Sequence, residues 1–207
     1  MSVEKKYDRF AALYDRFEGF IEKKFFSRFR EELFKRVEGK RILEVGIGTG
    51  KNVPYYPDDV DVVGVDVSEG MLRVCQERLK KFPEKKVKLL RADVQNLPFS
   101  DGEFDCVVST FVFCTVPDPM KGLKEVHRVL KPSGRAVFLE HMRSRKWYVN
   151  AMLFVMHIFT KSLLGTSMLR KTVDNIKKAG FMIEEEKHLL GDVVRLITAR
   201  KGGEESD

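Results

Sequence analysis

Residues 43–52 read LEVGIGTGKN, in which three glycines alternate with other residues and Glu44 stands two places before the first glycine. The run completes an apolar stretch, RILEVG at 41–46, which is typical of a buried parallel strand. Glycine permits a sharp turn after such a strand and lets a ligand approach the backbone. The stretch therefore predicts a ligand-binding turn at the end of the first strand of an α/β sheet.

Short apolar runs alternate with helical patterns after this turn. Further buried strands are predicted at 60–66, 87–93, 104–110 and 135–141. The stretch 68–82 has Ser68 as a helix N-cap, and the stretch 118–134 has Asp118 as a cap and Pro119 at the first helical position, with KPSG ending the helix. This alternation predicts a doubly wound α/β fold.

The two ends of the chain depart from the alternation. Aromatic and apolar residues at helical spacing predict two amphipathic helices before Gly39. A helix at 168–179 precedes two closing runs, 181–190 and 192–201. The connection between these runs is too short for a parallel crossover, so they are predicted to form a hairpin whose last strand is antiparallel to the rest.

Composition narrows the class of protein. The 207 residues fit one domain, and 43% hydrophobic with 33% charged residues describes a globular protein. The net charge of +7 suits an anionic partner or simply reflects Lys-rich solvated helices. Three cysteines without metal or disulfide spacing predict reduced core residues. Without a signal-peptide core or a long apolar run, we expect a cytoplasmic protein.

The ligand is indicated by the residues at three successive strand ends. The spacing G-x-G-x-G differs from the dinucleotide fingerprint, and Glu44 would repel a pyrophosphate but suit a cationic amino-acid group. Asp66 ends the second strand, where it would accept hydrogen bonds from ribose hydroxyls, and Asp93 ends the third within reach of an adenine amino group. These groups together predict S-adenosylmethionine. The alternative is an ordinary turn with two helix-capping aspartates.

With these motifs the sequence resembles the class I S-adenosylmethionine-dependent methyltransferases. It looks most like the quinone-biosynthesis C-methyltransferases and the related bacterial phospholipid N-methyltransferases. The resemblance runs from YDRFAALYD (7–15) through LEVGIGTG, VGVDVSEGML (63–72), DVQNLPF (93–99) and EVHRVLKPSG (125–134) to KKAGF (177–181).

The resemblance implies an α/β, doubly wound, seven-stranded sheet of order 3-2-1-4-5-7-6 with strand 7 antiparallel. It also implies N-terminal helices and a helical cap insert between strands 5 and 6. The whole chain, 1–207, would form a single methyltransferase domain. Its expected parts are N-terminal helices at 1–38, a cofactor-binding core at 39–141, a cap insert at 142–170, and a closing helix and hairpin at 171–201.

The resemblance also implies a set of cofactor-binding positions along the chain. The residues expected at the methionine end are Glu44, Gly46, Gly48, Gly50 and Asn52, with Ser109 approaching it after strand four and Tyr14 covering the bound cofactor. Those expected around the ribose and adenine are Asp66, Val67, Ser68, Met71, Asp93 and Val94.

Methyl transfer requires little chemistry from the protein, because the cofactor supplies the electrophile and the protein aligns the acceptor. Glu140 and His141 end strand five at the edge where open α/β sheets place ligands. They are the candidate catalytic pair: either could orient or deprotonate an acceptor, or both could only anchor the cap helix. The four histidines lack metal-ligand spacing, so no metal is expected.

The acceptor should be selected by the N-terminal helices and the insert at 142–170. The middle of this insert is apolar and aromatic, and its flanks are basic. It is either a cap helix packed on the domain or a lipophilic pocket with a membrane-interface face. The acidic or amide residue with two prolines that nucleic-acid amino methyltransferases carry after strand four is missing, so a nucleic-acid partner is not expected.

The leading functional hypothesis is methylation of a lipophilic small molecule, either a phospholipid amine or a quinone precursor. It includes peripheral contact with the inner face of the membrane. A soluble small-molecule acceptor is the enzymatic alternative. An RNA-modifying enzyme and a non-catalytic cofactor-binding module are the alternatives from other classes.

Overall fold

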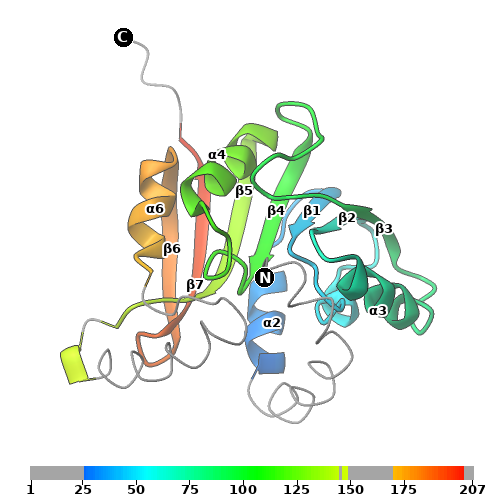
Figure 1. The fold of residues 1–207 in the computed structure, drawn as a ribbon, viewed down its shortest axis with the longest axis horizontal. Helices are drawn as coiled ribbons and strands as arrows, with labels where there is room; N and C mark the ends of the chain where they lie inside the picture. The colour runs from blue at the N-terminus through cyan, green and yellow to red at the C-terminus, as the bar shows by residue number, and fades with distance from the viewer. Residues whose placement is uncertain (1–25, 145, 149–169, 203–207) are drawn as a thin grey trace.

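The computed structural model describes residues 26–144, 146–148 and 170–202 of the chain. Seven strands form one sheet of order β3-β2-β1-β4-β5-β7-β6, as predicted, with β6 and β3 at its two edges (Figure 1). β7 is antiparallel to both β5 and β6. The strands are β1 (Arg41–Val45), β2 (Asp61–Asp66), β3 (Lys86–Arg91), β4 (Phe104–Thr110), β5 (Leu130–His141), β6 (Phe181–Leu190) and β7 (Val194–Lys201).

Helices cover both faces of the sheet, which is the doubly wound arrangement. On one face lie α4 (Pro119–Val129) and α6 (Thr172–Lys178), which contact each other over the β5–β7–β6 half of the sheet (Figure 1). On the other face lie α2 (Ser27–Phe34) and α3 (Glu69–Leu79). Neighbouring residues of one strand enter opposite layers of the core, because strand side chains alternate: Leu43 packs below α4 while Ile42 packs below α2.

The helices α3 and α4 begin at the N-cap residues that the sequence predicts. The Ser68 hydroxyl accepts a hydrogen bond from the Met71 N–H at 3.1 Å, and the Asp118 carboxylate accepts one from the Lys121 N–H at 3.0 Å. Each cap satisfies an N–H that the first helical turn leaves without a partner. Both predicted N-caps are therefore confirmed.

Strand pairing brings the carboxyl ends of β1, β2 and β4 to one edge of the sheet. Val45, the last residue of β1, pairs with Val65 on one side and Ser109 on the other. Asp66 and Thr110 then end the two neighbouring strands. The turn predicted from the glycines leaves the sheet at this edge, so the candidate site lies there.

The start of β5 differs from the sequence prediction. β5 begins at Leu130 rather than 135, because Leu130 pairs with Phe104 before a bulge resets the register at Cys106 and Arg135. The predicted hairpin is confirmed, with Gly191 in its turn at φ 55°. The three cysteines are free and buried, as predicted.

Several predicted features lie outside the described residues. They are the first N-terminal helix with Tyr14 and, in the cap insert, position 145 and positions 149–169. No helix within the described residues is long and apolar enough to cross a bilayer.

Candidate active site

The three glycines after β1 all have positive φ, but their surroundings differ. A Cβ on Gly46 would lie 2.4 Å from the Val112 side chain, and one on Gly50 would lie 2.6 Å from the Cys75 sulfur, so these two glycines permit tight packing. A Cβ on Gly48, at φ 55°, would meet only the Gly46 carbonyl oxygen at 3.9 Å. Gly48 therefore faces open space, and its bare backbone can receive a ligand.

Asp66 joins this loop to the end of β2. One carboxylate oxygen accepts a hydrogen bond from the Gly48 N–H and the other from the Ser68 N–H, each at 2.9 Å. A carboxylate oxygen can accept more than one hydrogen bond. Val67, between Asp66 and the buried Ser68, exposes 36% of its surface. The carboxylate is thus fixed beside Gly48 and can accept hydrogen bonds from a diol.

The loop leads into a short 3-10 helix, η2 (Val53–Tyr55), rather than a long α-helix. A dinucleotide-binding loop opens a long helix whose N-terminus faces the pyrophosphate. The observed turn therefore agrees with the predicted absence of a dinucleotide fingerprint.

Glu44 lies at the base of the loop and is almost fully buried. Its two carboxylate oxygens accept hydrogen bonds from the Tyr56 hydroxyl and from Asn52 Nδ2, the latter at 2.8 Å. Burial raises the pKa of the Glu44 carboxyl from 4.5 to about 7, although both hydrogen bonds favour the charged form. Asn52 also donates to the Thr110 hydroxyl at 2.9 Å and accepts from the Arg30 guanidinium of α2.

This network gives Asn52 and Glu44 structural partners that the sequence did not indicate. Arg30 and Tyr56 were not predicted as site residues, and Arg30 ties α2 to the glycine loop. The nearest sequence signal is the tyrosine pair in VPYYP just after the loop. Direct contact of Glu44 or Asn52 with a cofactor stays a prediction.

The residues expected around the adenine follow β2 and β3: Met71 lies in the first turn of α3, and Asp93 and Val94 come just after β3, which ends at Arg91. Met71 and Val94 are buried at 3% and 8% exposure. Asp93 is exposed, and its carboxylate accepts hydrogen bonds from the Gln95 N–H and from Gln95 Nε2, both at 2.9 Å. Ser109 is fully buried and donates to Glu140 Oε1 at 3.0 Å rather than facing the loop.

Sequence and structure comparisons identify the family. A methyltransferase-domain family model matches residues 43–138. The demethylmenaquinone methyltransferase of Geobacillus kaustophilus is 35% identical over 173 residues, which cover 78% of this chain and 74% of that protein. The chain belongs to the S-adenosylmethionine-dependent methyltransferases. The phosphatidylethanolamine N-methyltransferase of Cereibacter sphaeroides is 35% identical to this methyltransferase over 146 residues, 70% of each chain.

The fold is shared with a solved S-adenosylmethionine-dependent methyltransferase from Thermotoga maritima. The TM-score is 0.75 at 22% identity, over 95% of this chain and 99% of that one. S-adenosylmethionine is thus the cofactor of this methyltransferase, and the open space at Gly48 with the adjoining Asp66 carboxylate fits its aminoacyl and ribose parts.

On the acceptor side, Glu140 holds the turn that follows β4. Its Oε1 accepts hydrogen bonds from the Ser109 hydroxyl and the Val112 N–H at 3.0 Å and from the Phe113 N–H at 3.1 Å. Glu140 is 0% exposed, and burial raises the pKa of its carboxyl from 4.5 to about 7. These contacts are those of an anchor for the turn.

We expect Glu140→Gln to retain methyl transfer within about threefold of the wild type, because the amide oxygen can accept the same three hydrogen bonds. The measurement is kcat/KM beside the cofactor Kd. A loss of about hundredfold or more in kcat at unchanged cofactor affinity would contradict the anchor role and indicate a proton-transfer role.

His141 lies in an aromatic cluster at the carboxyl end of β5. Its ring stacks on Phe111 with centroids 4.3 Å apart, and Phe26 meets the His141 ring edge-on at 6.3 Å. His141 Nδ1 is buried and has no hydrogen-bond partner among the described residues. Phe111 is the one non-glycine residue with positive φ in the described part of the chain, at 57°. Sequence reasoning missed Phe111 and Phe26.

Burial lowers the pKa of the His141 imidazole from 6.5 to about 4, so the ring is neutral at pH 7. Because this pKa lies below that of the unfolded chain, the fold should lose stability as the pH falls from about 6.5 through 4, by up to about 3 kcal/mol. An NMR titration of the imidazole carbons should give a midpoint near 4. A midpoint near 6.5 would contradict this lowered pKa.

Proposed function

We propose that this methyltransferase acts on a lipophilic small molecule, either a quinone precursor or a phospholipid amine, held between the glycine loop and the ends of β4 and β5. The observation that carries the proposal is the cluster of Phe26, Phe111 and His141. Its rings surround one buried nitrogen that has no hydrogen-bond partner among the described residues. Such a surface suits an apolar acceptor that presents a single hydroxyl or amine. The named activities of the two relatives agree with both acceptor types.

In this proposal the protein aligns the acceptor and excludes water. S-adenosylmethionine, when bound, supplies a methyl group on a sulfonium centre. Gly48 and Asp66 fix the position of that group, and the aromatic cluster removes solvent from the acceptor. His141 hydrogen-bonds the acceptor through Nδ1. Because its pKa is lowered, the imidazole is a weak base at pH 7. It therefore suits orienting the acceptor better than taking up a proton from it.

The start of the cap insert supports peripheral contact with a membrane. Trp147 and Tyr148 expose 79% and 55% of their surfaces, and the Lys146 ammonium lies 6.0 Å from the Tyr148 ring. Exposed aromatic residues next to cations favour the interface of an anionic bilayer. This contact, like the exclusion of nucleic acid, stays a proposal.

The proposed role of His141 is tested with His141→Phe, which keeps a ring against Phe111 and removes the nitrogen. We expect kcat/KM for a lipophilic acceptor to fall about tenfold while the cofactor Kd is unchanged. His188→Phe is the matched control, because His188 lies on β6 and is 39% exposed.

Quinone-precursor and phosphatidylethanolamine acceptors are assayed in parallel with water-soluble ethanolamine. Turnover of ethanolamine alone, or equal kcat/KM in both histidine variants, would contradict the proposed function.

A further inference from the structure

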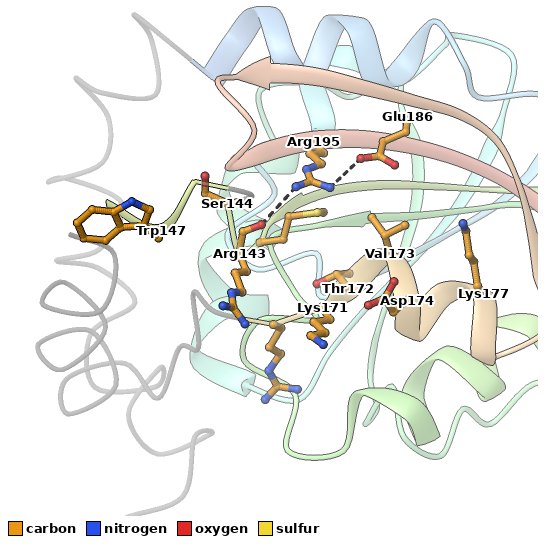
Figure 2. A pocket seen from close by; sticks show the side chains of 12 residues that line it. Arg143, Ser144, Trp147, Lys171, Thr172, Val173, Asp174, Lys177, Glu186 and Arg195 are labelled. Carbon is orange, nitrogen blue, oxygen red and sulfur yellow. Dashed lines mark hydrogen bonds and ion pairs between the residues drawn. The ribbon is translucent and has the colours of Figure 1, made fainter. Parts of the chain in front are cut away.

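A basic pocket of about 560 Å³ lies just past the end of β5, where residues of β6, of α6 and of the beginning of β7 line it. Figure 2 shows the side chains that line it, with Arg195 and Glu186 on β7 and β6 and Asp174 and Lys177 on α6. Met142, which immediately follows His141, forms part of its wall. The pocket therefore adjoins the proposed acceptor site, while the glycine loop lies at the end of β1, across β4 and β5 in the sheet.

The charge inside this pocket is strongly unbalanced. Arg195 is paired with Glu186, its Nη1 lying 2.7 Å from Glu186 Oε1 (Figure 2). Asp174 is the one other acid in the lining. It is outnumbered by four more cations, Arg143, Arg170, Lys171 and Lys177.

These four cations make few contacts of their own within the described residues. The side chains of Arg143, Lys171 and Lys177 have neither a hydrogen bond nor an ion pair there. Arg170 donates one hydrogen bond, from Nη2 to the Val116 carbonyl oxygen at 2.7 Å. Partial burial lowers the pKa of its guanidinium. A partly buried guanidinium without a carboxylate hydrogen-bonded to it is unfavourable. An anion bound beside Arg170 would offset that cost.

Part of the pocket wall is held by buried polar contacts of Arg195. Arg195 is 6% exposed and donates to the Asp192 carbonyl at 2.8 Å and to the Arg143 carbonyl at 3.3 Å. The Thr172 hydroxyl, on a lining residue that is 2% exposed, is buried and has no hydrogen-bond partner in the described chain. The wall thus holds Arg195 in place.

We propose that this pocket binds a phosphate group. Guanidinium and ammonium donors around this open pocket suit the charge of a phosphate and its several acceptor oxygens. A further step rests on the proposed function: the phosphate belongs to the lipid acceptor, whose reactive atom then lies toward His141. This step favours a phospholipid amine over a quinone precursor, because only the former carries a phosphate.

The test removes the three exposed cations together in the full-length protein, as Arg143→Gln, Lys171→Gln and Lys177→Gln. Binding of inorganic phosphate is measured by calorimetry without cofactor, and binding to phosphatidylglycerol vesicles by sedimentation. We expect the triple variant to bind phosphate, or the vesicles, about tenfold more weakly than wild type. An unchanged melting temperature confirms that the variant is folded.

The matched control removes the same charge at the opposite edge of the sheet, as Lys81→Gln, Lys86→Gln and Lys88→Gln. These three lysines are exposed around β3. The control should bind both probes within about twofold of wild type.

A pocket-specific loss with inorganic phosphate supports a site that accepts free phosphate. A pocket-specific loss with vesicles alone supports a lipid headgroup as the source. Equal losses in both triple variants, or none in either, would overturn the inference. Neither probe requires turnover. A failure of the phosphate inference therefore does not contradict the proposed methylation of a lipophilic acceptor, which the methyl-transfer assay tests separately.

Discussion

Gly48→Val should weaken S-adenosylmethionine binding more than about hundredfold, or about 2.7 kcal/mol, while the protein stays folded. The protein itself has room for a side chain there, since a Cβ would meet only one carbonyl oxygen at 3.9 Å. The valine would instead occupy the space that we expect the cofactor to fill against the loop. Calorimetry with the cofactor, beside a thermal melt, measures both quantities.

Gly191→Val is the matched control for this variant. Gly191 has the same φ of 55° and nothing within 4 Å of its Cβ position, but it lies in the β6–β7 hairpin. Both substitutions carry a backbone strain of about 1–3 kcal/mol, so both should lower the melting temperature similarly. Only Gly48→Val should lose cofactor binding. Normal affinity in Gly48→Val would mean that the loop is merely a turn.

Asp66→Ala should weaken cofactor binding by about 1.5–3 kcal/mol, roughly ten- to hundredfold. The substitution removes the acceptor proposed for the ribose hydroxyls. It also removes the hydrogen bonds that join the Gly48 and Ser68 N–H groups to β2. The variant should therefore lose affinity for adenosine as well as for the complete cofactor, which a competition titration measures.

Asp61→Ala, at the exposed opposite end of the same strand, is the control and should keep the affinity within about twofold. Unchanged cofactor affinity in Asp66→Ala would show that Asp66 does not bind the ribose hydroxyls. Tight NAD binding by the wild type would contradict the choice of cofactor.

The parts of the site that sequence predicts best lie at strand ends. Gly48 and Asp66 are 18 residues apart, yet their meeting follows from β1 and β2 being parallel neighbours whose carboxyl ends share an edge. The sheet order followed from the family resemblance, and the hairpin from the short link at Gly191. Helix caps are equally local, because a cap and its partner stand three residues apart.

The parts that sequence does not predict depend on side chains meeting across the fold. The partners of Glu44 come from the segment after the loop and, through Asn52, from Arg30 on α2. Neither periodicity nor strand order indicates which donor reaches a buried carboxylate. The basic pocket likewise draws its lining from residues between 142 and 195, and no contiguous motif marks it.

Methyl transfer from S-adenosylmethionine to a lipophilic acceptor is measured most directly with methyl-labelled cofactor and a bacterial membrane lipid extract. After incubation, label is counted in the organic and aqueous phases and the products are separated. We predict a discrete labelled product in the organic phase with the wild type and none with Gly48→Val. Label that enters only water-soluble acceptors, or no acceptor while the cofactor binds normally, would contradict the account.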